Sequence, residues 1–475
     1  MKKHITGILI SLLVLSTMSG CGKDKKITYM DEQATTSDAT NASEIHLNYD
    51  IADERMSFTI DADVDTTLSN QSAPVAKASR CDYTDDDIKR IADAIFDTGS
   101  YSLFIPYAFR SMEDVKSACD IMQEEIAQYS DIADVPYTLL QECYDAQKRL
   151  EDGFSADPIQ NNGELKWYTA PVSDNSNIDI NSQFCTIKGT VNNKPYYLSF
   201  TRTDSRCMMV LHANYEPYTP YAWFLNQDAN AVYENDLFPN ECQYSQTDAK
   251  SIVLDTLQTI GITDYQITDI REAQTAKTNY EISSSGQVTE SQINTDSSYD
   301  SYLLYGGRVI DNLSPIHTDA NFSSEITPET ADENEDPSTS YTDTKFGFEA
   351  VIANVGNDGI NYLIVQNPMK VDEILETKAH TLSFDQIDAI AQDYITKHDG
   401  SNLPYYITGT YMVHDIQYGL IRVSDEDTSS YMYIPAWYYM VDGESSSTQY
   451  CTFSSYVIIS AIDGSIYNNY SGDIN

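Results

Sequence analysis

Apolar and polar residues alternate between residues 45 and 64, and the alternation is regular from residue 56 onward. A period of two is typical of a β-strand that buries one face and exposes the other. Asp61, Asp63 and Asp65 all fall on the polar face. Their spacing also occurs in calcium-binding loops, but the glycine and the distal glutamate of such a loop are missing. We therefore expect a half-buried strand here and no metal site.

Three stretches carry apolar residues at helical spacing, with the same signals at their ends. They begin after the hydroxyl residues Thr84, Ser245 and Ser383 and end near Gly99, Gly261 and Gly400. In each, an Asp or Gln three positions after the hydroxyl residue indicates a capping box, and the glycine suits a left-handed helix end. The pattern predicts amphipathic helices over 84–99, 245–261 and 383–400. Two further helical segments are expected at 112–129 and 136–150.

A tight-turn signal between strand-like runs follows each of these three helices. The signals are Asn192-Asn193, Asn357-Asp358-Gly359 and Asp463-Gly464. These residue types tolerate the left-handed conformations of two-residue hairpins. The order of a helix followed by a hairpin turn therefore recurs three times. Either a divergent triplication or three independent helices packed on sheets explains it. Both explanations give an α+β fold class, in which amphipathic helices pack on antiparallel sheets.

The same patterns divide the chain into segments. We predict a signal peptide at 1–20, a lipidated tether at 21–44, an N-terminal α+β domain with extra helices at 45–240, a middle α+β domain at 241–370 and a C-terminal α+β domain at 371–475. Residues 283–298 and 327–344 are rich in polar residues and poor in aromatic ones. Because such stretches bury little apolar surface to offset chain entropy, we expect disordered loops there.

The first 21 residues combine a basic start at Lys2 and Lys3, an apolar run over 5–15, and small residues before Cys21. This arrangement resembles the signal peptide of a bacterial lipoprotein. The resemblance implies cleavage before Cys21, attachment of lipid acyl chains such as palmitate to that residue, and an extracytoplasmic protein anchored to the cell membrane. An uncleaved anchor is the alternative, but the apolar run is shorter than the roughly 20 residues that span a bilayer.

Composition narrows the possible partners. The chain has 73 acidic and 28 basic side chains, which give a formal net charge of −45. A charge of this sign and size repels DNA and RNA, so no nucleic-acid partner is expected. The 36 tyrosines suit strands with one solvent-exposed face, because the ring packs while the hydroxyl remains in water.

The sequence contains no recognisable catalytic motif. Its histidines form no H-E-x-x-H motif, its cysteines form no C-x-x-C pair, and there is no G-x-S-x-G, P-loop or G-x-G-x-x-G. No catalytic residue, metal site or cofactor is therefore predicted. With 73 carboxylates, a glycosidase-like pair cannot be nominated from the sequence.

Two aromatic groups remain. The first consists of Tyr215, Tyr218, Tyr221, Trp223 and Phe224, in a segment broken by two prolines. Because proline places this segment in a loop or edge strand, it is a candidate platform for a sugar or groove for an extended peptide; packing between domains is the alternative. The second group consists of Tyr431, Tyr433, Trp437, Tyr438 and Tyr439. The alternation of Tyr431, Tyr433, Trp437 and Tyr439 predicts one buried face of a strand.

The carboxyl-terminal segments 433–437 and 459–466 resemble those of uncharacterised Gram-positive surface lipoproteins. A helix followed by a strand meander that ends in Ile-Asp-Gly-x-Ile also resembles PepSY-type modules, which occur in peptidase propeptides and in extracytoplasmic regulators such as YycH and YycI. The resemblance implies helix-plus-meander units that bind or regulate a partner, and it carries no catalytic residue across.

These observations together predict a membrane-anchored, non-enzymatic lipoprotein that binds or regulates a peptide, a protein or a cell-wall-associated ligand. A membrane protein or a peptide is the expected partner beside the membrane itself. The alternatives are a carbohydrate-binding surface protein that uses the Tyr215–Phe224 cluster, and a hydrolase with dispersed acidic residues.

Overall fold

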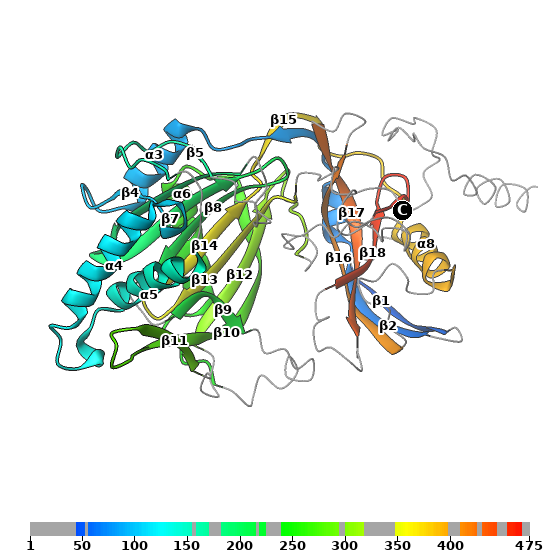
Figure 1. Ribbon diagram of the computed structural model, residues 1–475. Coiled ribbons are helices and arrows are strands. Elements are labelled where there is room, and N and C mark those ends of the chain that lie inside the picture. The colour runs from blue at the N-terminus through cyan, green and yellow to red at the C-terminus, as the bar shows by residue number, and fades with distance from the viewer. Residues whose placement is uncertain are drawn as a thin grey trace, which may run out of the picture.

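The computed structural model has an α+β architecture in which two sheets lie side by side (Figure 1). It describes residues 44–52, 56–153, 158–170, 182–214, 218–224, 239–293, 300–317, 347–397, 409–424, 430–443 and 454–467. The predicted signal peptide, Cys21 and the tether up to residue 43 lie outside these ranges. Within them, no helix is both long enough and apolar enough to cross a membrane.

The larger sheet contains eleven strands in antiparallel pairs. They are β4 (Ser102–Phe104), β5 (Tyr168–Thr169), β6 (Gln183–Val191), β7 (Lys194–Arg202), β8 (Cys207–Ala213), β9 (Tyr218–Phe224), β10 (Tyr265–Ile282), β11 (Val288–Ile293), β12 (Ser301–Arg308), β13 (Ala350–Gly356) and β14 (Gly359–Gln366). Their order is β11-β10-β12-β13-β14-β8-β7-β6-β4, with β5 on β6 and β9 on β10. Asn192 and Asn193 have φ of 52° and 62°, which confirms the predicted tight turn between β6 and β7.

The smaller sheet contains eight strands from both ends of the chain. They are β1 (Glu44–Ala52), β2 (Met56–Asp65), β3 (Val75–Arg80), β15 (Met369–Glu376), β16 (Gly409–Ser424), β17 (Ser430–Gly443), β18 (Ser454–Ser460) and β19 (Ile466–Tyr467). The pairing of β2 with β16 is parallel, and the other pairings are antiparallel. The alternation in β2 is confirmed, because Phe58, Ile60, Ala62 and Val64 are buried while the intervening aspartates are exposed.

Strand β17 is buried on both faces. The predicted face of Tyr431, Tyr433, Trp437 and Tyr439 lies in the main core, as expected from the sequence. The alternate residues Met432, Ile434, Ala436, Tyr438 and Met440 belong to a second apolar cluster.

The helices are α2 (Thr67–Gln71), α3 (Asp85–Ile95), α4 (Met112–Ile126), α5 (Tyr137–Asp152), α6 (Gln246–Thr259) and α8 (Phe384–Lys397). The five predicted helices are thus confirmed. Capping boxes join Thr84 to Asp87 and Ser245 to Asp248. At α8, the backbone N–H of Ser383 donates to the side chain of Gln386 at 3.0 Å.

Helices cover both faces of the larger sheet. Ile91 of α3 and Leu257 of α6 share a buried cluster with Leu198 of β7, so these two helices lie on one face. Successive side chains of a strand point to opposite faces. The next residue, Tyr197, donates its hydroxyl hydrogen to Glu142 of α5 at 3.0 Å, which places α5 on the other face. Helix α8 packs instead on the smaller sheet, where the rings of Phe384 and Trp437 are 4.8 Å apart.

The two sheets cross the domain boundaries predicted from the sequence. Strands β1 to β3 of the predicted domain 45–240 pair with strands of the predicted domain 371–475. The rest of the first segment and most of 241–370 form the larger sheet together. Periodicity identifies a strand but not its partner, because the partner can lie anywhere in the chain.

Part of one predicted disordered loop is ordered. Residues 283–293 of the segment 283–298 form the turn after β10 and the strand β11. Val288 is buried in the cluster formed by α4 and α5, and its backbone N–H donates to Gln147 at 2.8 Å. The segment around Val288 has few apolar residues of its own, and it becomes ordered because it packs against these helices. Residues 294–298 and the second predicted loop, 327–344, lie outside the described ranges.

Candidate functional site

A polar pocket of about 450 Å³ opens at one end of the β6–β7 hairpin. It is lined by Arg80, Asp82, Thr169, Gln183, Arg202, Thr203 and Asp204. Cavities of this size accommodate small molecules.

Strand pairing brings these residues together. Gln183 pairs with Arg202 at the open end of the hairpin, opposite the Asn192-Asn193 turn. Thr169 of β5 pairs with Gln183 on its other side. Thr203 and Asp204 follow directly in the turn to β8, where the backbone N–H of Thr203 donates to the carbonyl of Arg206 at 2.7 Å.

Arg202 is held in place by two neighbours. Its Nε donates to Gln183 Oε1 at 2.6 Å, and its Cζ lies 4.4 Å from the ring centroid of Trp167. Trp167 is itself fixed, because its indole N–H donates to the carbonyl of Tyr83 at 2.9 Å. A planar guanidinium stacks well on an indole face. Within the described ranges, Arg202 forms no ion pair with a carboxylate, so its charge is not neutralised by direct contact.

Each of the three nitrogens of the Arg80 guanidinium has a hydrogen-bond partner. Its Nε contacts Asp82 Oδ1 at 2.5 Å, and its terminal nitrogens donate to the backbone carbonyls of Thr203, at 2.7 Å, and Asp204. Arg80 ends β3, and its backbone pairs with Met369 of β15. The pocket therefore lies where a strand of the smaller sheet reaches the larger sheet. That strand, β3, pairs with β15, which is labelled near the top of Figure 1.

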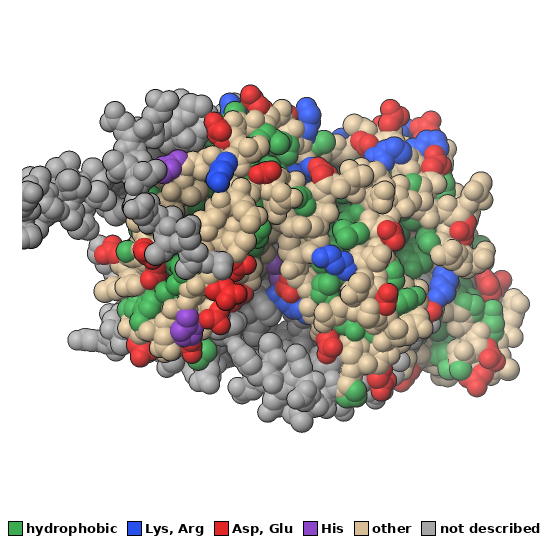
Figure 2. Space-filling view, turned by 180° about the vertical axis from the view of Figure 1, so that it is seen from behind, with side chains coloured by type: hydrophobic (Ala, Val, Ile, Leu, Met, Phe, Trp, Pro, Cys, Tyr) green, Lys and Arg blue, Asp and Glu red, His purple; other side chains and the backbone are tan. Residues whose placement is uncertain are grey.

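The arrangement provides fixed charges and hydrogen-bonding groups. The pocket contains two guanidinium groups, although acidic side chains in this chain outnumber basic ones by 73 to 28. Acidic side chains are spread over the face seen in Figure 2. Guanidinium groups bind carboxylates and phosphates through paired hydrogen bonds. In the part of the chain that the structure describes, no group of His, Cys, Asp and Glu side chains is arranged to hold a metal ion.

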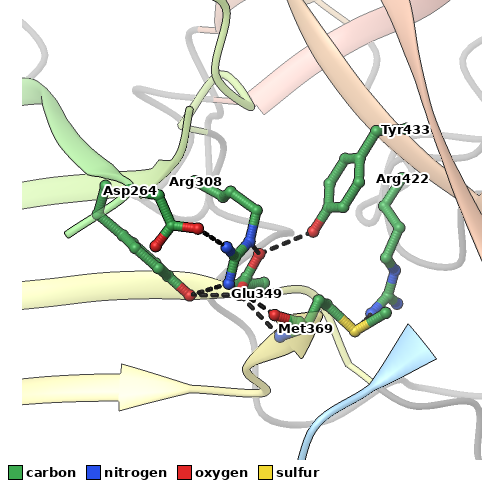
Figure 3. A network of polar contacts seen from close by, with 7 residues as sticks. Asp264, Arg308, Glu349, Met369, Arg422 and Tyr433 are labelled. Atoms are coloured by element: carbon green, nitrogen blue, oxygen red, sulfur yellow. Dashed lines mark hydrogen bonds and ion pairs between the residues drawn. The ribbon is translucent and has the colours of Figure 1, made fainter. Parts of the chain in front are cut away.

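A second polar cluster joins the two sheets, and its members Glu349, Arg308 and Tyr433 are buried (Figure 3). Glu349 accepts two hydrogen bonds of 2.9 Å from Arg308 of β12 and one of 2.9 Å from the hydroxyl of Tyr433 of β17. It also accepts one from the backbone N–H of Met369 at 2.7 Å. Burial and the charge of Glu349 raise the pKa of Tyr433 well above its usual value, so its hydroxyl stays protonated. The cluster is a structural joint, because its polar groups bind one another.

A third cluster surrounds His317. Its Nδ1 lies 3.0 Å from both Asp269 Oδ2 and Arg271 Nη2, and its ring stacks on Tyr305 at 3.6 Å. Burial lowers the pKa of His317 to about 4, although the contact with Asp269 acts in the opposite direction. The imidazole is therefore neutral at pH 7.

The structure describes the candidate aromatic site only in part. Tyr218–Phe224 forms the strand β9, and Trp223 pairs with Thr275 of β10. Tyr215, and the side chains of Tyr218, Tyr221, Trp223 and Phe224, lie outside the described part of the chain. The pocket around Arg202 was not predicted. No motif spacing marks it, because its residues come from β3, β5, β6, β7 and the loops beside them.

No protein-family model matches the chain, and no curated protein matches it. Among solved structures, the chain is similar to an uncharacterized protein from Eubacterium rectale, with 11% sequence identity and a TM-score of 0.37. The match covers 90% of this chain and 93% of that chain. A likeness at this TM-score supports no functional inference.

Proposed function

We propose that the protein is an extracytoplasmic, membrane-tethered binding protein that holds a small polar ligand in the pocket around Arg202. The observation that carries this proposal is the guanidinium of Arg202, fixed by Gln183 and Trp167 at the wall of a pocket of about 450 Å³. A side chain fixed before binding loses little conformational entropy when the ligand arrives. The ligand is a peptide or a cell-wall-associated molecule, as the lipoprotein-like amino terminus suggests.

Binding without catalysis is the function that best suits these side chains. Arg80 and Asp82 hold each other, and Arg80 also holds the turn at Thr203. Their hydrogen bonds keep the shape of the pocket constant. The remaining side chains include a cation, an amide and hydroxyl groups, which together bind a polar molecule by charge and hydrogen bonds.

The proposal is tested by thermal unfolding of the full-length protein in detergent, with and without candidate ligands. The panel contains short peptides, cell-wall peptide fragments, monosaccharides and inorganic phosphate. A ligand that binds only the folded state raises Tm as its concentration increases. We expect at least one peptide to raise Tm in the natural protein and to have no effect on the Arg202→Gln variant.

The matched control is Lys116→Gln, which removes an exposed cation that pairs with Asp120 on the surface of α4. This variant should respond to ligand like the natural protein. The proposal is wrong if no member of the panel raises Tm, or if Arg202→Gln responds as strongly as the control.

A further inference from the structure

The described cysteines include a pair whose thiols contact each other. Cys119 lies near the middle of α4 and Cys143 near the middle of α5, and both are buried. These two helices pack against each other and share one apolar cluster (Figure 1). The thiol of Cys143 is hydrogen-bonded to the sulfur of Cys119. The two sulfur atoms therefore face each other across the contact between the helices.

The surroundings of this pair leave one kind of chemistry open to it. Zinc sites in proteins use three or four protein ligands, whereas Val115, Leu140 and Ala146 of the same cluster are apolar. Within the described ranges, no group of His, Cys, Asp and Glu side chains is arranged to hold a metal ion. A bond between the two sulfurs remains.

We propose that Cys119 and Cys143 form a disulfide that locks α4 to α5. A disulfide persists in an oxidising compartment, so the inference rests on the extracytoplasmic location proposed above but not on the pocket around Arg202. The sulfurs must approach from hydrogen-bonding distance to about 2.05 Å, and rotation of two short side chains brings them together.

The oxidant is a second disulfide, carried by a thiol–disulfide oxidoreductase or supplied as glutathione disulfide. The Cys119 thiolate attacks one sulfur of that disulfide and releases a thiolate, and the Cys143 thiolate then attacks the mixed disulfide and releases the second. Two S–H bonds of the protein are thus oxidised to one S–S bond. The oxidant takes up the two electrons and the two protons and becomes two thiols.

Burial determines when this reaction occurs. It raises the pKa of Cys143 to about 12 and also raises the pKa of Cys119, so both thiols are protonated in the folded protein at pH 7. Because the thiolate is the nucleophile, the folded protein reacts slowly, and the bond forms while the helices are still packing together.

The disulfide joins two helices that together hold the turn between β10 and β11. The carbonyl of Gly286 in this turn accepts hydrogen bonds from Gln123 of α4 at 3.3 Å and from Gln147 of α5 at 3.2 Å. Gln147 also accepts the backbone N–H of Val288. Fixing α4 to α5 therefore also fixes β11, which lies at the edge of the larger sheet.

The first test reads the bond in full-length protein from the membrane fraction. Cells are lysed without reductant in denaturant that contains N-ethylmaleimide, which blocks free thiols, and mass spectrometry identifies linked peptides after proteolysis. We expect a peptide pair joined through Cys119 and Cys143, with neither residue alkylated. Alkylation of both residues would overturn the proposal.

The second test separates the pair from its compartment. Reduced full-length protein is refolded in detergent with reduced and oxidised glutathione, and we expect the same linked peptides in most molecules. Failure to form the bond here would overturn the disulfide and leave the proposed function intact. A bond that forms here but is missing from the protein of the membrane fraction would overturn the disulfide in the natural protein and count against the extracytoplasmic location.

A double variant, Cys119→Ala with Cys143→Ala, tests what the bond does. Dithiothreitol should lower the Tm of the natural protein by roughly 2–4 °C, because reduction opens the loop 119–143 in the unfolded chain. The double variant should have the same Tm with and without dithiothreitol. The matched control is Cys185→Ala, which removes a buried thiol of β6 and should keep the full response. An equal response in the double variant and the control would overturn the proposal.

Discussion

At the scale of single residues, contacts with neighbours fix which groups are charged and where they lie. Arg202 is positioned by Gln183 and by Trp167, which in turn is held by the carbonyl of Tyr83. His317 is the contrasting case, because burial keeps it neutral. Neither environment can be inferred from the residues adjacent in sequence, since the partners come from other elements.

His317 should make the protein less stable as the pH falls from 6.5 towards 4. Its pKa is about 4 in the folded protein, below the ordinary value of 6.5 that holds in the unfolded chain. In this pH window the unfolded chain takes up a proton and the folded protein does not, so the free energy of unfolding decreases by up to about 3 kcal/mol. Chemical denaturation at several pH values measures the change.

The corresponding control is His317→Gln, which cannot titrate. The natural protein should lose more stability than this variant between pH 6.5 and 4, and the two should change in parallel above pH 7. Parallel pH dependence through the whole range would show that His317 is not buried as a neutral imidazole.

At the scale of helices and strands, local sequence patterns were sufficient to predict most elements. The helices α3, α4, α5, α6 and α8 and the buried faces of β2 and β17 were predicted, because capping residues and periodicity are local signals. Strand β11 was missed because its burial depends on α4 and α5. The pocket was missed for the same reason: Arg80 and Arg202 meet only after strands from distant parts of the chain have paired.

The joint between the two sheets depends on Glu349. In Glu349→Gln, Arg308 would keep its charge in a buried position and lose its bidentate partner, and Tyr433 would face an amide. Breaking a buried ion pair at one side typically costs about 3 kcal/mol or more. We expect a loss of that size in the free energy of unfolding, measured by chemical denaturation at pH 7.

Asp120→Asn breaks the exposed ion pair with Lys116 and should change stability little. If Glu349→Gln were as stable as this control, the cluster in Figure 3 would not be the joint between the sheets.

At the scale of the whole molecule, the two ends of the described chain meet in one sheet. Strands β1 to β3 pair with β15, β16 and β17, so the smaller sheet cannot form until most of the chain has been synthesised. The first described residue, Glu44, belongs to β1 of this sheet. The tether predicted at 21–44 would therefore connect the membrane directly to the smaller sheet.

Membrane attachment should depend on Cys21 alone. The Cys21→Ala variant should appear in the soluble fraction after cell lysis, with the same unfolding transition as the natural protein, because the described fold begins at Glu44. Fractionation followed by thermal unfolding of the soluble material measures both. Retention of the variant in the membrane would contradict the lipid anchor.

Titration calorimetry measures directly whether the pocket around Arg202 binds a small polar ligand. A peptide from the panel that raises Tm would be titrated into the natural protein and into the Arg202→Gln and Lys116→Gln variants. We expect one site per chain, an affinity at least about tenfold weaker in Arg202→Gln, and an unchanged affinity in Lys116→Gln. Equal affinities in all three proteins would show that the ligand does not bind in the pocket around Arg202.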